Sequence, residues 1–402
     1  MPSRSWLVLL AATVFIQVAA NFMTQAVWVL APALTSSAAV APERIGDLAA
    51  LVSLGSIIFF VFGGTLLLRF GSMRMIQAGI LVTVASVGLL LFGSWPLMLL
   101  GNLMMGLGYG PSPPAGSDIL ARSVPPRQKA LAFSVRQAGG PLGAMIAGAT
   151  LPAIALAMGW RTALVVSAIV GIVCVMALQP LRAAVDATRQ RDLQLSFRSM
   201  FGIASLLAPI RSMRLAPSLP SLTAAAVALA LVHGSLSTFM VTYMTTEIGL
   251  PFTLAGITYS ALQLGGMVGR IFVGWIADRV GTVIATLKVL AVTTTAMTLV
   301  MAAIQPTWPV ALTLAVIVLT GIAATSWNGI HLAEVARLAP EGKVSEAASG
   351  SVFFTFLAYS LGPFLFSQAV SVVGSYGPVF AASALLGLVA GVALIFADRK
   401  AR

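Results

Sequence analysis

The sequence predicts an all-α membrane protein with twelve transmembrane helices in two pseudo-symmetric six-helix bundles. Of its 402 residues, 59% are hydrophobic and only 8% are charged, whereas soluble domains carry about 25% charged residues. A helix needs about 20 apolar residues to cross the hydrocarbon core, and twelve helices with their loops would each take about 33 residues of this chain. A repeat completes the argument, because the turn at residues 274–282 has a weaker copy at residues 64–72 in the same register.

The long apolar runs give the domain organisation. We expect an N-terminal bundle over residues 1–181, a cytoplasmic linker over 182–217 and a C-terminal bundle over 218–402. The first run, residues 6–34, is about twice as long as the apolar core of a signal peptide, so we expect an uncleaved first span. Other spans are expected at residues 73–91, 160–181, 219–243, 255–276, 283–301, 308–336, 347–373 and 378–396.

The distribution of charge indicates topology. The net charge is +12, but nearly all Lys and Arg fall in alternate loops, so we interpret it as the inside-positive pattern rather than nucleic-acid binding. Both termini are therefore expected in the cytoplasm. The single Cys174 excludes an internal disulfide or a Cys-based metal site. The chain also lacks phosphate-binding, metal-spaced and nucleophile–base motifs, so we expect no enzyme activity, no cofactor and no metal.

The turn at residues 274–282 reads Gly-Trp-Ile-Ala-Asp-Arg-Val-Gly-Thr. Its Gly-x3-Asp-Arg-x-Gly pattern, between the second and third helices of a repeat, resembles the signature loop of the major facilitator superfamily. The resemblance covers almost the whole chain, and it implies alternating access to a site near mid-membrane. It also implies a monomer in the lipid bilayer.

In that family the loop latches the cytoplasmic side through charge pairs, so the resemblance implies a gating role for both copies. The first copy has Leu68 where the acid is expected, which argues against a symmetric latch. Gly274 is expected to allow close packing and Gly281 to allow a tight turn. The gating residues are Gly274, Asp278, Arg279 and Gly281 in the intact copy, and Gly64, Arg69, Gly71 and Arg74 in the weaker one.

Two acids lie near the inner ends of helices 4 and 10. Asp118 is expected to pair with Arg69 or Arg74, and Glu334 with Arg279 or Arg270. We assign both acids to the latch networks, with proton coupling as the alternative. Helix 4 itself should kink or unwind, because glycines and prolines interrupt it between residues 106 and 116.

Arg136 breaks the internal symmetry. Aligning residues 140–141 with 362–363, both Gly-Pro, places Ala358 opposite Arg136. An unpaired arginine at the centre of a span costs about 3 kcal/mol, so we expect a partner or an anionic substrate. Snorkelling or pairing with Asp118 is the alternative.

Other polar side chains within the spans complete the candidate site. Gln17, Asn21 and Gln25 form one stripe on helix 1, either lining a cavity or bonding a neighbouring helix. His331 and His233 are proton-coupling candidates, because histidine titrates near neutral pH; hydrogen-bonded packing is the alternative. The expected substrate-binding residues are Arg136, Gln137, Asn21, Gln25, Asn328 and Tyr359.

Together these features predict a secondary transporter in a bacterial inner membrane. We expect it to move a small organic anion, such as a carboxylate, in symport with protons. A proton-driven exporter of drug-like or neutral compounds is the alternative. The resemblance argues against it at one position of helix 4, because this chain has Asn102 where the drug antiporters of the family carry an arginine. A non-transporting membrane sensor is the third reading, and the polar residues within the spans argue against it.

Overall fold

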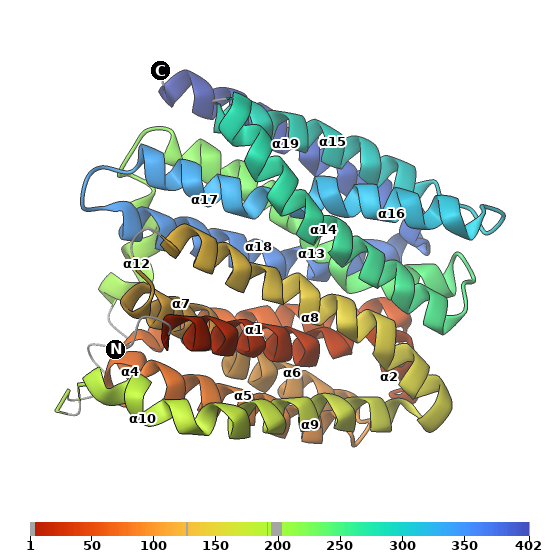
Figure 1. The fold of residues 1–402 in the computed structure, drawn as a ribbon. Coiled ribbons are helices and arrows are strands. Elements are labelled where there is room, and N and C mark those ends of the chain that lie inside the picture. Colours follow the sequence, from red (N-terminus) through yellow and green to blue (C-terminus); the bar gives the residue numbers. More distant parts are fainter. Residues whose placement is uncertain (1–4, 126–127, 191, 194–202, 281, 402) are drawn as a thin grey trace. The chain divides into compact units, whose positions relative to one another are not determined.

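The computed structural model describes residues 5–125, 128–190, 192–193, 203–280 and 282–401. Within these ranges every regular element is a helix, so the all-α prediction is confirmed (Figure 1). Eleven helical segments are long and apolar enough to cross a membrane. The fourth expected span is not among these eleven, and it is divided into two shorter helices, α6 (Trp95–Tyr109) and α7 (Ser112–Ser123).

The chain forms two compact units. Unit 1 comprises residues 1–41 and 51–202, and unit 2 comprises residues 42–50 and 203–402. Residues 42–50, which precede the second span, thus group with the later part of the chain, which the sequence did not predict. The expected bundle and linker boundaries remain a prediction.

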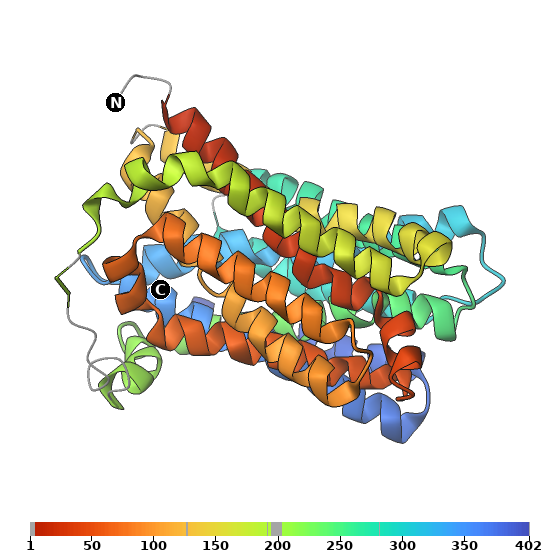
Figure 2. The same ribbon diagram turned by 90° about the horizontal axis from the view of Figure 1, so that it is seen from below.

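Unit 1 is built on two helix pairs. In both views α1 lies beside α8 and α5 beside α6 (Figures 1 and 2). Gly143 of α8 allows the first contact, because a side chain there would collide with the Val18 carbonyl of α1. Besides α6 and α7, the elements of unit 1 are α1 (Ser5–Val29), α2 (Ala31–Ser37), α3 (Ile45–Phe62, in unit 1 from residue 51), α4 (Gly64–Phe70), α5 (Ser72–Leu90), α8 (Lys129–Met158), α9 (Trp160–Leu178), η3 (Gln179–Leu181), α10 (Arg182–Val185) and η4 (Asp186–Thr188).

Unit 2 packs around α13, which lies against both α18 and α19, while α15 also lies against α19. Residues 42–50 join it through Ser367, whose Oγ donates to the Glu43 carbonyl at 2.7 Å, and Ser360, whose Oγ donates to the Ala50 carbonyl at 3.0 Å. Its elements are η1 (Pro42–Arg44), α12 (Ile203–Ser212), α13 (Leu219–Thr246), α14 (Phe252–Val280), α15 (Val283–Ala302), α16 (Val310–Thr325), α17 (Trp327–Leu338), α18 (Val344–Val373) and α19 (Tyr376–Ala401).

Each unit contains one interrupted span. The break between α6 and α7 lies at Gly110 and Pro111, as the sequence predicts, because proline cannot donate to the helix ladder. The break between α16 and α17 lies at Ser326 and was not predicted, since neither glycine nor proline marks it. Beside it, Arg270 Nε of α14 donates to the Thr325 carbonyl at 3.4 Å and satisfies a backbone acceptor at the helix end.

Candidate functional site

Arg136 is almost completely buried in unit 1, with 2% of its surface exposed. Its Nη2 donates to Gln17 Oε1 at 3.2 Å and to the carbonyls of Ser112 at 2.9 Å and Pro113 at 3.2 Å. Its Nη1 donates to Ser117 Oγ at 3.3 Å. All four acceptors are neutral, so the guanidinium is hydrogen-bonded but its charge is not balanced by an acid among the described residues.

The interrupted fourth span makes this arrangement possible. Ser112 and Ser117 both lie on α7, which starts directly after the break. Gly116, between them, lets the guanidinium approach the α7 backbone, because a Cβ atom there would lie 2.5 Å from Arg136 Nη2. Among the described residues Arg136 Nε has no hydrogen-bond partner, and it is also shielded from solvent. One donor of the buried cation is therefore unpaired in the described part of the chain.

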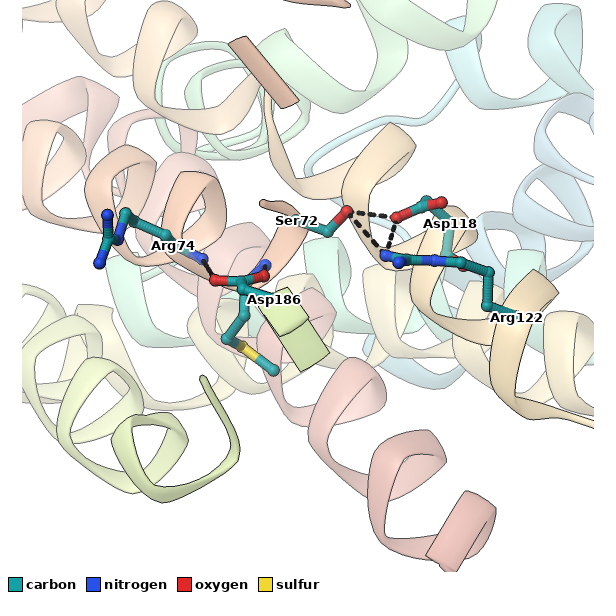
Figure 3. Close-up of polar contacts among 6 residues, drawn as sticks. Ser72, Arg74, Asp118, Arg122 and Asp186 are labelled. Atoms are coloured by element: carbon teal, nitrogen blue, oxygen red, sulfur yellow. Dashed lines mark hydrogen bonds and ion pairs between the residues drawn. The ribbon is translucent and has the colours of Figure 1, made fainter. Parts of the chain in front are cut away.

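Asp118 does not neutralise Arg136, nor does it bind Arg69 or Arg74 as expected. It forms an ion pair with Arg122 and accepts a hydrogen bond from Ser72 Oγ (Figure 3). In the same view the guanidinium of Arg74 points away from this group. Asp118 and Arg122 are one helical turn apart on α7, a geometry that favours local pairing over pairing with the loop.

Glu334 in unit 2 also pairs locally rather than with Arg279 or Arg270. Arg337 holds it with both prongs of its guanidinium, Nε at 2.9 Å from Oε2 and Nη2 at 2.5 Å from Oε1. Glu334 is 1% exposed. Asp118 and Glu334 are thus alike, because each pairs with an arginine of its own helix.

The signature turns are described in part. Arg279 lies over the Trp275 ring, 4.1 Å from its centroid. The close packing expected at Gly274 is not observed, because a Cβ atom there would meet nothing within 4 Å. The same is true of Gly64 in the weaker copy. Gly281 and the side chain of Asp278 lie outside the described residues.

Unit 2 contains two separate hydrogen-bonded histidines. Tyr359 OH lies 2.9 Å from His233 Nδ1 and accepts from Asn328 Nδ2 at 3.1 Å. His331 Nε2 lies 2.8 Å from Ser351 Oγ, which also accepts from Thr223 Oγ1 at 3.1 Å. The structure therefore brings Asn328, Tyr359 and His233 together, and places His331 in a different network.

The other expected residues of unit 1 are not all at the Arg136 cluster. Gln137 is exposed, because the next position on a helix points about 100° away from Arg136. Asn21 Nδ2 donates to the Gln17 carbonyl of its own helix at 3.0 Å. Gln17 takes the place expected for Gln137. The position of Gln17 on the polar stripe of α1 was the sequence signal for its contact with Arg136, whereas nothing in the sequence singled out Ser112 or Ser117.

Comparison with known proteins gives one family. Residues 13–363 match the family model of the Major Facilitator Superfamily. A hexuronate transporter of Bacillus subtilis is 25% identical over 146 residues, which are 36% of this chain and 35% of that protein. A probable chloroplastic anion transporter of Oryza sativa subsp. japonica is 26% identical over 113 residues, 28% of this chain and 24% of that protein.

A longer match is to an uncharacterized MFS-type transporter of Mycobacterium tuberculosis, 26% identical over 284 residues, 69% of this chain and 60% of that protein. The matched regions span less than two thirds of the length of each of these curated relatives.

Among solved structures, a bacterial homolog of the human lysosomal transporter Spinster, inward-facing and unoccupied, has a TM-score of 0.77 and 14% identity, covering 100% of this chain and 98% of that one. A peptide transporter, POT, has a TM-score of 0.76 and 17% identity, covering 98% of this chain and 95% of that one. At these identities the likeness shows the fold alone.

Proposed function

The chain belongs to the major facilitator superfamily, and from this membership we propose that it is a secondary transporter of a small organic anion, with a carboxylate bound at Arg136. Its family makes it a multi-pass membrane transporter and not an enzyme. The anion, the coupling ion and the alternating-access cycle belong to the proposal.

The observation that carries the proposal is the unbalanced charge of Arg136. Neutral acceptors bind its Nη1 and Nη2 groups without neutralising the cation. Burial of an uncompensated charge is unfavourable by an energy on the order of several kcal/mol. A carboxylate would supply the missing charge and form charge-assisted hydrogen bonds, which are about twice as strong as neutral ones. The unpartnered Nε is a donor for such a ligand.

The names of two relatives support the same substrate class. One is a hexuronate transporter and the other a probable anion transporter, and a hexuronate is a carboxylate. Their low identity and partial coverage support the class of substrate rather than a particular compound.

We assign coupling and topology as part of the same proposal. Protons are the coupling ion, with His331, His233, Glu334 and Asp118 as candidate carriers. The Lys and Arg distribution supports cytoplasmic termini in a bacterial inner membrane. The turns at residues 64–72 and 274–282 are proposed to gate the inner side of a monomeric transporter.

Ligand-induced thermal stabilisation of the purified protein tests the anion site. A ligand at about 100 times its Kd stabilises the folded state by about 2.7 kcal/mol. We expect small carboxylates, including glucuronate, to raise Tm in the wild type and not in Arg136→Ala, with Arg136→Lys partly retaining the effect because it keeps the charge. Arg161→Ala is the matched control, since Arg161 is exposed and stacks on Trp160.

Two outcomes would contradict the proposal. Stabilisation by carboxylates that survives in Arg136→Ala would remove Arg136 from the binding site. Stabilisation by neutral or cationic drug-like compounds instead of carboxylates would favour the exporter.

A further inference from the structure

Asp186 is a buried carboxylate that neither the family match nor the anion site accounts for. It lies in η4, directly after α10, and is 1% exposed. Its Oδ1 accepts from the backbone N–H of Met73 at 2.9 Å, and its Oδ2 accepts from the backbone N–H of Arg74 at 3.0 Å (Figure 3). Both donors belong to the first turn of α5, where backbone N–H groups lack partners within the helix.

The turn before α5 is shaped to receive this carboxylate. Gly71 has φ +95°, a conformation that side-chain-bearing residues rarely adopt. A Cβ atom on Gly71 would also collide with the Asp186 carboxyl group. The glycine is therefore needed both for the backbone conformation and for the close approach of Asp186.

The chain after Asp186 is fixed to the same turn by two more bonds. The Gln190 backbone N–H donates to the Leu68 carbonyl at 2.9 Å, and Arg69 Nη1 donates to the Leu193 carbonyl at 2.6 Å. Leu68 is the residue that stands where the signature pattern has an acid, and its own side chain is 52% exposed. An acid that lies 118 residues after Leu68 thus binds the backbone directly beyond this turn.

Unit 2 also has an acid near the end of its last helix. Asp398, near the end of α19, pairs with Lys288 Nζ of α15 at 2.6 Å, and both side chains are about one-third exposed.

The cap lies next to the residue that connects α5 to α7. Ser72 directly precedes the two capped residues, and its Oγ donates to Asp118 of α7. The same helix supplies Ser112 and Ser117 to the Arg136 guanidinium. A continuous path of hydrogen bonds and one helix thus joins Asp186 to the anion site.

We propose that Asp186 is a positioning residue for the Arg136 site. By capping α5 it holds Ser72 against Asp118, and this contact keeps α7 packed at its inner end around the buried guanidinium. The inference rests on the proposed function only in taking Arg136 as the ligand-binding group.

The test uses two readouts that need no substrate. Hydrogen exchange of peptides covering Met73 and Arg74 reports the cap itself. Labelling of a single-cysteine protein, Ser112→Cys in a Cys174→Ser background, by a membrane-impermeant maleimide reports access to the site. In Asp186→Asn we expect both rates to rise by at least about fivefold, because local opening becomes more frequent when a cap is lost.

The matched control is Asp192→Asn, which removes one charge from an exposed position six residues further along the same segment. It should leave both rates unchanged. Asp186→Glu keeps the carboxylate, so it should raise the hydrogen-exchange and labelling rates less than Asp186→Asn does. If Asp186→Ala does not fold, the near-isosteric Asp186→Asn still decides the question.

Two results would overturn the inference. Unchanged hydrogen exchange in Asp186→Asn would mean that the carboxylate does not hold the turn. Faster exchange with unchanged labelling would mean that the cap stabilises α5 without positioning the site. The carboxylate stabilisation assay reports the anion proposal separately, so failure of one proposal is not mistaken for failure of the other.

Discussion

Arg136 in unit 1 and Glu334 in unit 2 are both almost fully buried, but only one of these charges is neutralised. Glu334 is bound by Arg337 through two hydrogen bonds. Among the described residues, Arg136 donates hydrogen bonds only to neutral oxygens, from Gln17, Ser112, Pro113 and Ser117. A closed ion pair is complete without a ligand, whereas an unbalanced cation is not, and our proposal of a structural role for Glu334 and a binding role for Arg136 rests on this difference.

The largest effect on stability should come from breaking the closed pair. Arg337→Ala leaves the buried Glu334 carboxylate without its partner, and because the Arg337 side chain is itself 60% exposed we expect a cost of about 1–2 kcal/mol, less than for a fully buried pair. Chemical denaturation of the purified protein measures the loss. Glu334→Gln should cost less, because Arg337 is largely solvated and remains so. Equal losses would contradict this view of the pair.

Removing the unbalanced charge should cost less. Arg136→Met keeps much of the side-chain volume and removes an uncompensated buried cation, which offsets the loss of its hydrogen bonds to four acceptors, so the stability of the ligand-free protein should change by less than about 1 kcal/mol. The same denaturation experiment measures it. A loss of stability as large as that of Arg337→Ala would show that Arg136 is a structural charge after all.

The contact between Arg136 and α7 can be altered by a substitution that leaves the charge of Arg136 unchanged. Gly116→Ala places a methyl group 2.5 Å from Arg136 Nη2, so the guanidinium must move, and we expect carboxylate binding to weaken by about fivefold, or about 1 kcal/mol. Titration of the Tm shift gives the Kd. Gly274→Ala is the control, because its methyl group meets nothing within 4 Å.

The smallest effect should come from the neutral network of unit 2. Tyr359→Phe removes the hydroxyl that joins His233 to Asn328, and a neutral hydrogen bond contributes about 0.5–1.5 kcal/mol net. We expect a stability loss near the lower end of this range and unchanged carboxylate binding. Loss of binding in this variant would extend the anion site to Tyr359.

Asp118 and Glu334 show how much of the charge pairing the residue pattern predicts. The sequence placed Asp118 and Glu334 near helix ends, and both lie there. The partners that we expected from it were wrong, although residues one turn apart on the same helix meet without any tertiary contact and the observed pairs could have been predicted from their spacing. The expected partners in the loops required a fold in which those loops approach the acids.

By itself the sequence determined the helices, the break after Gly110 and the presence of an unmatched arginine in a span. These follow from local rules, since apolar runs must cross the bilayer and proline cannot donate a backbone hydrogen bond. Tertiary structure alone decided which oxygens surround Arg136 and which acid caps α5. Gln17 and Asp186 are each more than 100 residues from their partners, and contacts at that separation depend on how helices pack rather than on the residues beside them.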